Sequence, residues 1–283
     1  ALSDPYKAAD ETYYKILVPE KNSKGKGVRK GYLWVVVGIN TRMIYLLYDD
    51  GSRSERVILN ELGSCKGIIQ SDGYSPYRKL ESDAYHNITR IPCLQHIKRK
   101  FIDCGEKEPD AKRIVELINA LYQNEHKHKA GAEGWTVEQN LMHRKKYAPD
   151  ILGEIKDVLD EIEERGDLLP KSELQEAITY LRNEWNAVVD IFNYGDTYLD
   201  NNMVERMNRY ISLSRKNSLF FGSHKGAERG AILYTIALTC RMHKVNLFEY
   251  LTDVINRTAE WQPNTPIEKY RELLPDRWEK AND

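Results

Sequence analysis

Three acidic residues of this chain occupy positions where a carboxylate is expected to bind a metal ion or a cation. Asp10 lies within an apolar, strand-like segment, Asp72 follows a second such segment, and Glu205 begins a run of basic residues. An acid on a strand of a core sheet is unfavourable unless it binds a metal ion or pairs with a cation. Carboxylate oxygens are ligands that Mg²⁺ prefers. These residues therefore suggest a metal site.

The stretch from residue 200 to 231 adds groups that bind phosphate. Between Glu205 and residue 231 the only further acid is Glu228, whereas cations and asparagines are frequent. Cations and amide groups donate hydrogen bonds to phosphate oxygens. The predicted phosphate-binding residues here are Arg206, Arg209, Arg215, Lys216, Asn217, Lys225 and Arg229. Together the two groups favour phosphodiester chemistry, in which two Mg²⁺ ions about 4 Å apart activate the attacking oxygen and stabilise the leaving one.

Spacing alone leaves a second interpretation open for these residues. The chain contains 43 acidic residues, so many triples exist and ordinary surface carboxylates are an alternative. Arg206 and Arg209 suit phosphate, and they equally suit ion pairs with a nearby acid such as Asp200. Phe220 and Phe221 lie close in sequence to these cations, and surfaces that bind single-stranded nucleic acid combine aromatic and basic residues in this way. The preferred interpretation nevertheless places both phenylalanines in the core.

A further candidate group lies at residues 93–100. Cys93 and His96 form a C-x-x-H pair, but structural zinc requires a second pair, and the sequence offers none at suitable spacing. Two interpretations of His96 stay open. In one it contacts the scissile phosphate or helps to orient a metal ligand, and in the other it is a hydrogen-bonded histidine beside a packed cysteine. The cations that follow on the same predicted helix are expected to contact a nucleic-acid backbone: Lys98, Arg99 and Lys100.

The elements that position these residues follow from hydrophobic periodicity. The predicted strands are 6–18, 33–38, 43–48, 67–70 and 88–91. The predicted helices among them are 54–62, 75–80 and 94–104. The order βββαβαβα describes an α/β sheet with three antiparallel strands and two crossover-linked strands. A lysine- and glycine-rich loop at 20–31 is either a solvated turn or a phosphate contact.

The second half of the chain changes to helical periodicity. Three apolar stripes between residues 114 and 192 recur at i, i+3, i+4 and i+7, which indicates an all-helical insertion. A helix at 202–212 then follows, with Glu205 expected on the side opposite its apolar stripe of Met203, Val204, Met207, Tyr210 and Ile211. The expected domains are 1–105 (sheet domain, first part), 106–199 (helical insertion), 200–243 (sheet domain, second part) and 244–283 (C-terminal helical tail).

Composition limits the class of protein. The 283 residues are 41% hydrophobic, which is enough for a real core. The net charge is −1, so any nucleic-acid surface must be a local patch. We find no run of about 18 apolar residues and expect no membrane span. Irregular spacing favours reduced thiols of a cytosolic protein for Cys65, Cys93, Cys104 and Cys240.

Several motifs together resemble the insertion-sequence-66 family of transposases. They are DET at 10–12, SDGY at 71–74, CLQHIKRKF at 93–101 and the long DNNMVERMNRYISLSRKNSLFFGSHKGAERGAILYT at 200–235. The resemblance covers the chain from Asp10 to about residue 255. It implies a ribonuclease H-like fold, a mixed five-stranded sheet flanked by helices, with the helical insertion before the last acid. It also implies a catalytic, metal-binding triad of Asp10, Asp72 and Glu205, with His96 beside it.

The resemblance further implies a DNA transposase. Mg²⁺, with Mn²⁺ as a substitute and two ions expected, would activate water for cleavage at the transposon end, and the freed 3′-hydroxyl would attack target DNA. Expected partners are the terminal inverted repeats, target DNA, further copies of the chain on DNA and accessory proteins of the element, in the bacterial cytoplasm at the nucleoid. The alternatives are a ribonuclease H-like nuclease that cuts without joining and a DNA-binding protein that has lost catalysis. Nothing matches the N-terminal region that family members carry, so we expect a fragment.

Overall fold

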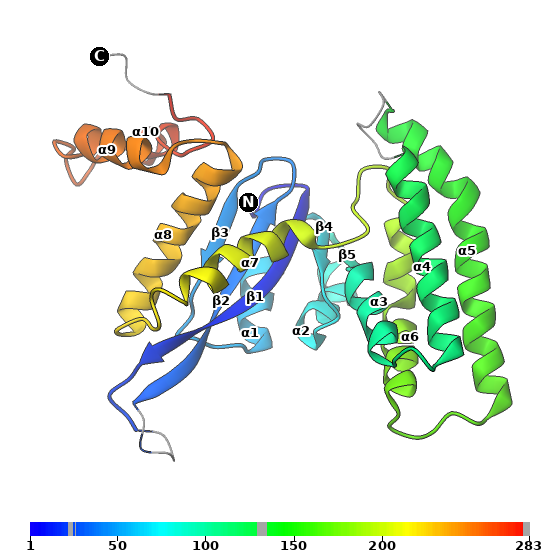
Figure 1. The fold of residues 1–283 in the computed structure, drawn as a ribbon. Helices are drawn as coiled ribbons and strands as arrows, with labels where there is room; N and C mark the ends of the chain where they lie inside the picture. The colour runs from blue at the N-terminus through cyan, green and yellow to red at the C-terminus, as the bar shows by residue number, and fades with distance from the viewer. Residues whose placement is uncertain (22–24, 26, 129–134, 280–283) are drawn as a thin grey trace. The chain divides into compact units, whose positions relative to one another are not determined.

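A five-stranded sheet organises the fold. The computed structural model describes residues 1–21, 25, 27–128 and 135–279, and the strand order is β3-β2-β1-β4-β5 (Figure 1). The strands are β1 (Tyr6–Leu17), β2 (Val28–Gly38), β3 (Ile44–Leu47), β4 (Gly67–Ser71) and β5 (Ile88–Pro92). β2 pairs antiparallel with both β1 and β3. The expected mixed sheet of the ribonuclease H-like type, flanked by helices, is confirmed.

The β1–β2 hairpin is longer than the sequence pattern indicated. Its register pairs Asp10 with Val35 and continues to Leu17 opposite Val28. We expected β2 to begin at residue 33 and assigned 28–31 to a loop, which is wrong. The charged side chains of Arg29 and Lys30 suggested a loop, but they are exposed, and strand pairing with β1 tolerates them. Residues 22–24 and 26 lie outside the described residues, so a phosphate contact by this loop stays a prediction.

One helix covers the edge strand β3 of the sheet, and another packs against the β1–β2 hairpin. α8 (His224–Met242) covers the edge strand β3, because the hydroxyl oxygens of Thr235 and Thr239 accept hydrogen bonds from the backbone nitrogens of Leu46 (2.9 Å) and Ile44 (3.2 Å). Such cover satisfies backbone groups that an open edge would expose. α7 (Asn202–Ser214) packs against β1 and β2.

The described part of residues 106–199 is built from helices, as the three stripes predicted. α5 begins with a capping box, in which the Thr136 hydroxyl accepts from the Gln139 nitrogen, and it ends at Gly166 in the left-handed region (φ 65°). The insertion helices are α4 (Pro109–His128), α5 (Val137–Arg165) and α6 (Glu173–Ile191). The other helices are α1 (Glu55–Leu62), α2 (Ser75–Arg78), α3 (Leu94–Asp103), α9 (Leu247–Thr258) and α10 (Ile267–Glu272), with short 3-10 turns at Lys79–Glu81 and Asp83–Tyr85.

The chain divides into two compact units. Unit 1 comprises residues 1–69, 83–88 and 202–283, and unit 2 comprises 70–82 and 89–201. The division passes within β4 and within β5. Unit 1 therefore contains the β1–β2–β3 ladder with α7 and α8, and unit 2 contains α3 to α6. The four-part domain division expected from the sequence stays a prediction.

Candidate active site

Asp10 lies in the middle of β1, and its carboxylate accepts hydrogen bonds from Glu11 and Asn208. It is half-buried, whereas its neighbours Ala8 and Ala9 are fully buried. Oδ1 accepts from the backbone nitrogen of Glu11 at 2.8 Å, and Oδ2 accepts from Asn208 Nδ2 at 2.6 Å. The second bond joins β1 to α7, which also carries Glu205. Unit 1 thus links two of the three predicted acids through Asn208.

Glu205 lies next to the buried face of α7 rather than opposite it. The buried residues of this helix are Val204, Met207, Asn208 and Ile211, and Glu205 is half-buried. We expected Glu205 opposite a stripe that included Met203 and Tyr210, but both of these are only half-buried, and the buried face is shifted toward Asn208. The hydrogen bond from Asn208 to Asp10 holds the Asn208 side of α7 against β1. Glu205 precedes Asn208 by about one turn and therefore lies at the edge of the buried face.

Asn208 is a site residue that sequence reasoning missed. Its side chain is only 8% exposed, and its Oδ1 atom is buried with no hydrogen-bond partner among the described residues. A buried amide oxygen without a partner is unfavourable, and an amide oxygen is also a hard ligand of the kind that divalent cations take. The signal in the sequence was an asparagine three residues after Glu205, next to the apolar stripe.

Asp72 lies in unit 2, directly after the last residue of β4, in a turn that several hydrogen bonds hold in place. Its carboxylate Oδ1 accepts from the backbone nitrogen of Tyr74 at 3.1 Å. Its carbonyl accepts from Arg90 Nη1 at 3.2 Å. Gly73 donates its N–H to the Tyr180 hydroxyl at 2.8 Å, and a Cβ at Gly73 would lie 2.5 Å from that oxygen. The turn that presents Asp72 therefore has no room for a side chain at position 73.

Arg90 is the buried cation of this turn. Its guanidinium is fully buried and pairs with Glu184 of α6 at 2.5 Å and with Glu81. Burial by itself lowers the pKa of Arg90, but the charges of Glu184 and Glu81 outweigh it and raise the pKa. Arg90 therefore stays charged, and its N–H groups remain donors, one of which bonds to the Asp72 carbonyl.

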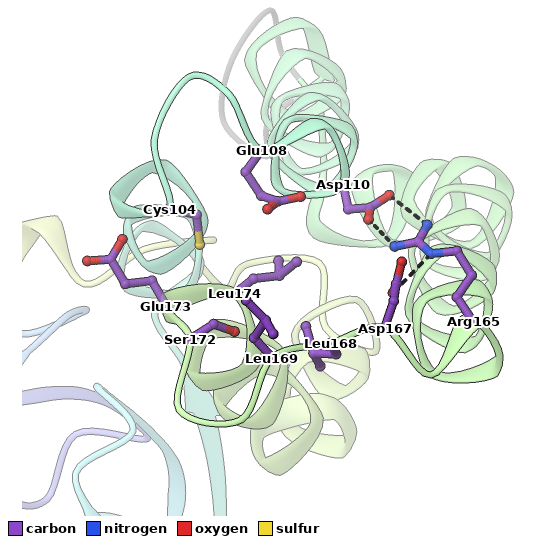
Figure 2. A pocket seen from close by; sticks show the side chains of 10 residues that line it. All are labelled: Cys104, Glu108, Asp110, Arg165, Asp167, Leu168, Leu169, Ser172, Glu173 and Leu174. Atoms are coloured by element: carbon purple, nitrogen blue, oxygen red, sulfur yellow. Dashed lines mark hydrogen bonds and ion pairs between the residues drawn. The ribbon is translucent and has the colours of Figure 1, made fainter.

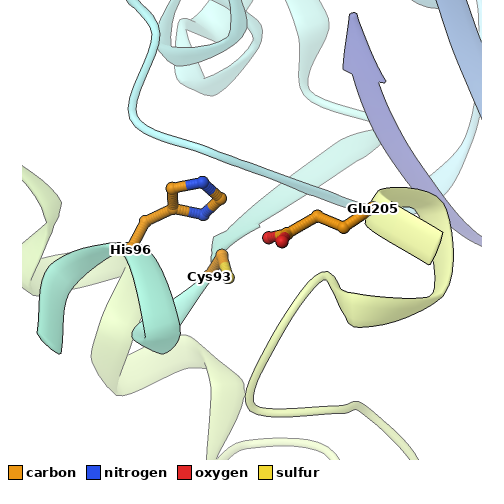
Figure 3. Close-up of side chains that lie close together, drawn as sticks. All are labelled: Cys93, His96 and Glu205. Carbon is orange, nitrogen blue, oxygen red and sulfur yellow. The ribbon is translucent and has the colours of Figure 1, made fainter. Parts of the chain in front are cut away.

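Cys93 and His96 flank the start of α3, also in unit 2. Figure 3 labels both side chains, with Cys93 directly before α3 and His96 in its first turn, and it also labels Glu205 of the first turn of α7 in unit 1. Cys93 is buried, and its sulfur accepts from the backbone nitrogen of Asn201 at 3.3 Å. The Leu94 nitrogen donates to the Leu199 carbonyl at 2.9 Å. The beginning of α3 is thus bonded to residues that directly precede α7 in the chain.

Arg144 fixes the segment between α6 and α7. This fully buried arginine of α5 forms two bonds with the Glu125 carboxylate, each 2.7 Å long. It also donates to the Thr197 hydroxyl (2.7 Å), to the Thr197 carbonyl (2.6 Å) and to the carbonyl of Tyr194. One guanidinium therefore satisfies a buried acid and the backbone of the segment that leads to Glu205.

The predicted DNA-binding cations are mostly exposed. In unit 2, Arg99 and Lys100 are exposed and Lys98 is half-buried with its Nζ 5.9 Å from the Tyr122 ring centre. In unit 1, Arg215 is half-buried over Tyr13. The remaining residues of unit 1 in this group are all exposed: Arg206, Arg209, Lys216, Asn217, Lys225 and Arg229. Exposed cations are accessible to DNA phosphates, and their contact with DNA stays a prediction.

The two phenylalanines in the basic stretch differ from their expected burial. Phe220 is 46% exposed, so its assignment to the core is wrong. Phe221 is half-buried and packs its ring 4.3 Å from that of Tyr14, while its backbone bonds to β1 at Lys15 and Leu17. Because the backbone pairing places the adjacent side chain outward, only one of two consecutive phenylalanines is covered.

A shallow pocket of about 340 Å³ lies within unit 2, where the α3–α4 and α5–α6 connections meet (Figure 2). Four acids line it, and Arg165 pairs with two of them, Asp110 and Asp167. It contains none of the residues predicted for the active site. Its acidic lining disfavours a DNA phosphate, so the pocket is not a candidate for the catalytic centre.

The five-stranded mixed sheet flanked by helices is a ribonuclease H-like fold. The family model described as transposase IS66 family matches residues 1–229, and the chain belongs to that family. It is therefore a protein of a transposase family.

Curated relatives in Sinorhizobium fredii (strain NBRC 101917 / NGR234) are similar to this chain over most of its length. Uncharacterized protein y4jD is 29% identical over 233 residues (80% of this chain, 44% of that protein), and uncharacterized protein y4qI is 28% identical over 275 residues (92% and 49%). The chain thus spans less than half the length of these relatives. Within the described residues, no helix combines the length and the apolar character needed to cross a membrane.

Proposed function

We propose that the chain catalyses cleavage of DNA at transposon ends and joins the freed end to target DNA. The observation that carries the proposal is the bond between Asp10 and the helix of Glu205, in a chain of the transposase IS66 family. In the active enzyme Asp72 joins Asp10 and Glu205, and the three carboxylates hold divalent cations. The donor set fits, because all three ligands are hard oxygens and a buried amide oxygen lies beside Asp10.

The chemistry consists of two displacements at phosphorus. In the first, a water oxygen bonds to the scissile phosphorus and the P–O3′ bond breaks, which leaves a 3′-hydroxyl on the transposon end. In the second, that hydroxyl oxygen attacks a target phosphodiester and a target 3′-oxygen leaves. A bound divalent cation supplies charge stabilisation and an activated oxygen. His96 contacts the scissile phosphate, and the exposed cations of α3, α7 and α8 hold the flanking phosphates.

We also propose the setting of this reaction. The enzyme acts in the bacterial cytoplasm on terminal inverted repeats and target DNA, as a homo-oligomer assembled on DNA, with accessory proteins of the same element. The helical insertion at 106–199 forms a domain of its own within the divided sheet domain.

The test is strand joining by the full-length protein with labelled transposon-end DNA. Mg²⁺ or Mn²⁺ should support joined products, and EDTA should abolish them, because no side-chain nucleophile replaces the cation. Cleaved but unjoined ends with either metal would instead indicate a nuclease. DNA binding without any cleavage would indicate a protein that has lost catalysis.

Asn208→Leu should weaken Mn²⁺ binding by roughly 10- to 100-fold, the effect typical of residues that orient a metal ligand. Leucine preserves the volume of the side chain but leaves Asp10 Oδ2 without the amide donor. Calorimetric titration of the full-length protein with Mn²⁺ measures the change without reference to activity. Ile211→Val, on the same buried face, is the matched control for helix packing. Equal Mn²⁺ affinity in both variants would contradict an orienting role for Asn208.

A further inference from the structure

One face of the β1–β2 hairpin carries tyrosines and lysines in matched pairs. Tyr13 lies directly opposite Tyr32, and Lys15 lies directly opposite Lys30. Side chains alternate along a strand, so these four share a face, and Asp10 is on the other one. β3 pairs only with residues 34–37 of β2, so this part of the hairpin extends beyond that ladder.

The tyrosine rings hold the neighbouring cations in place. Lys30 Nζ is 4.3 Å from the centre of the Tyr13 ring and 5.4 Å from that of Tyr32. The guanidinium carbon of Arg215 is 4.2 Å from the Tyr13 ring centre, and Arg215 also donates to the Tyr13 carbonyl. The guanidinium carbon of Arg53 is 5.2 Å from the centre of the Tyr32 ring. Cations above aromatic faces lose freedom before any ligand arrives.

The charges on this face are poorly balanced within the protein. Glu11 pairs with Arg53 at 2.5 Å and neutralises that cation. Lys15 and Lys30 are exposed and directly opposite each other, an arrangement that is unfavourable across a strand pair. An extended anion that lies over both lysines and Arg215 would remove this repulsion.

We propose that Lys15, Lys30 and Arg215, ordered by Tyr13 and Tyr32, bind the phosphates of duplex DNA that flanks the cleavage site. The rings are engaged by cations, which favours contact with the backbone over stacking of bases. The inference rests on the proposed transposase function. It adds a DNA surface on the hairpin, on the face opposite Asp10, to the basic residues expected on α7 and α8.

The experiment is fluorescence anisotropy of a labelled duplex titrated with the full-length protein over a series of NaCl concentrations. Lys30→Gln should weaken binding roughly five- to tenfold and reduce the slope of log K against log salt by about 0.9, the value for one lost phosphate contact. Tyr13→Leu should weaken binding without a change in protein charge, whereas Tyr13→Phe keeps the ring and should bind as the parent does. Lys66→Gln, an exposed lysine near the start of β1, is the charge-matched control and should bind normally.

Three outcomes would overturn the inference. The first is that Lys30→Gln and Tyr13→Leu both bind the duplex with the affinity and the salt slope of the parent protein. The second is an equal loss in Lys66→Gln, which would show a general charge effect. The third is a loss in Tyr13→Leu for single-stranded DNA alone, which would show base stacking. If the parent itself fails to bind duplex DNA, the proposed transposase function fails as well, so the two failures are distinguishable.

Discussion

Asp10→Asn, Asp72→Asn and Glu205→Gln should each lower the rate of strand joining by about a thousandfold or more. Each substitution removes one of the three proposed negative ligands while it preserves the shape of the side chain. Charge stabilisation by a bound divalent cation amounts to several kcal/mol, and about 4 kcal/mol corresponds to a factor of a thousand in rate. Gel analysis of labelled ends under single-turnover conditions measures cleavage and joining separately for each variant.

Glu228→Gln is the matched control for the loss of a carboxylate. It neutralises an exposed acid in the same basic stretch as Glu205, and its rate should stay within a few-fold of the parent. Wild-type joining by any one of the three site variants would remove that residue from the triad. A similar loss in all four variants would mean that net charge, and not metal binding, controls the reaction.

Arg144→Met should destabilise the protein by roughly 3–5 kcal/mol, because it leaves the buried carboxylate of Glu125 without its cation. The Thr197 hydroxyl and carbonyl lose their donors at the same time. Urea denaturation of the full-length protein measures the change in the free energy of unfolding. Hydrogen exchange should also accelerate at residues 191–199, the segment that precedes α7.

Arg113→Met provides the comparison for Arg144→Met. Arg113 pairs with Glu161 at 2.7 Å, but both side chains are about half exposed, so its loss should change stability little. Adding Glu125→Leu to Arg144→Met removes the unpaired charge and should recover part of the lost stability. If the double variant is as unstable as the single one, the backbone bonds of Arg144, rather than its ion pair, carry the effect.

Local sequence patterns predicted most of the elements. The strand that carries Asp10, the short strand before Asp72 and the insertion helices all lie close to their expected positions, because alternation and helical stripes are local properties. The start of β2 was misplaced where charged residues occupy an exposed part of a strand. The exposure of Phe220 was missed because it depends on the backbone pairing of Phe221 with β1.

The residues that brace the candidate site could not be found in this way. Asn208 bonds to Asp10 across 198 positions, Arg90 pairs with Glu184 across 94, and Gln70 donates to the Tyr198 carbonyl across 128. A single sequence contains no signal for such distant partners, and the residue type alone does not show whether an arginine is buried or exposed. The triad itself was predicted by family resemblance, since spacing alone did not distinguish it from other acids.

Unit 1 is built from segments that are far apart in the chain, and this affects how the protein folds during its synthesis. The β1–β2 hairpin leaves the ribosome early, but the helix that covers it begins at residue 202, after the whole of unit 2. At about 5–20 residues per second, roughly 8–33 seconds pass between synthesis of the end of the hairpin and synthesis of the first residue of α7. Unit 2 can complete its helices during that interval. Nascent chains halted before residue 202 should therefore expose hydrophobic strands and recruit chaperones, whereas the completed and released chain should not.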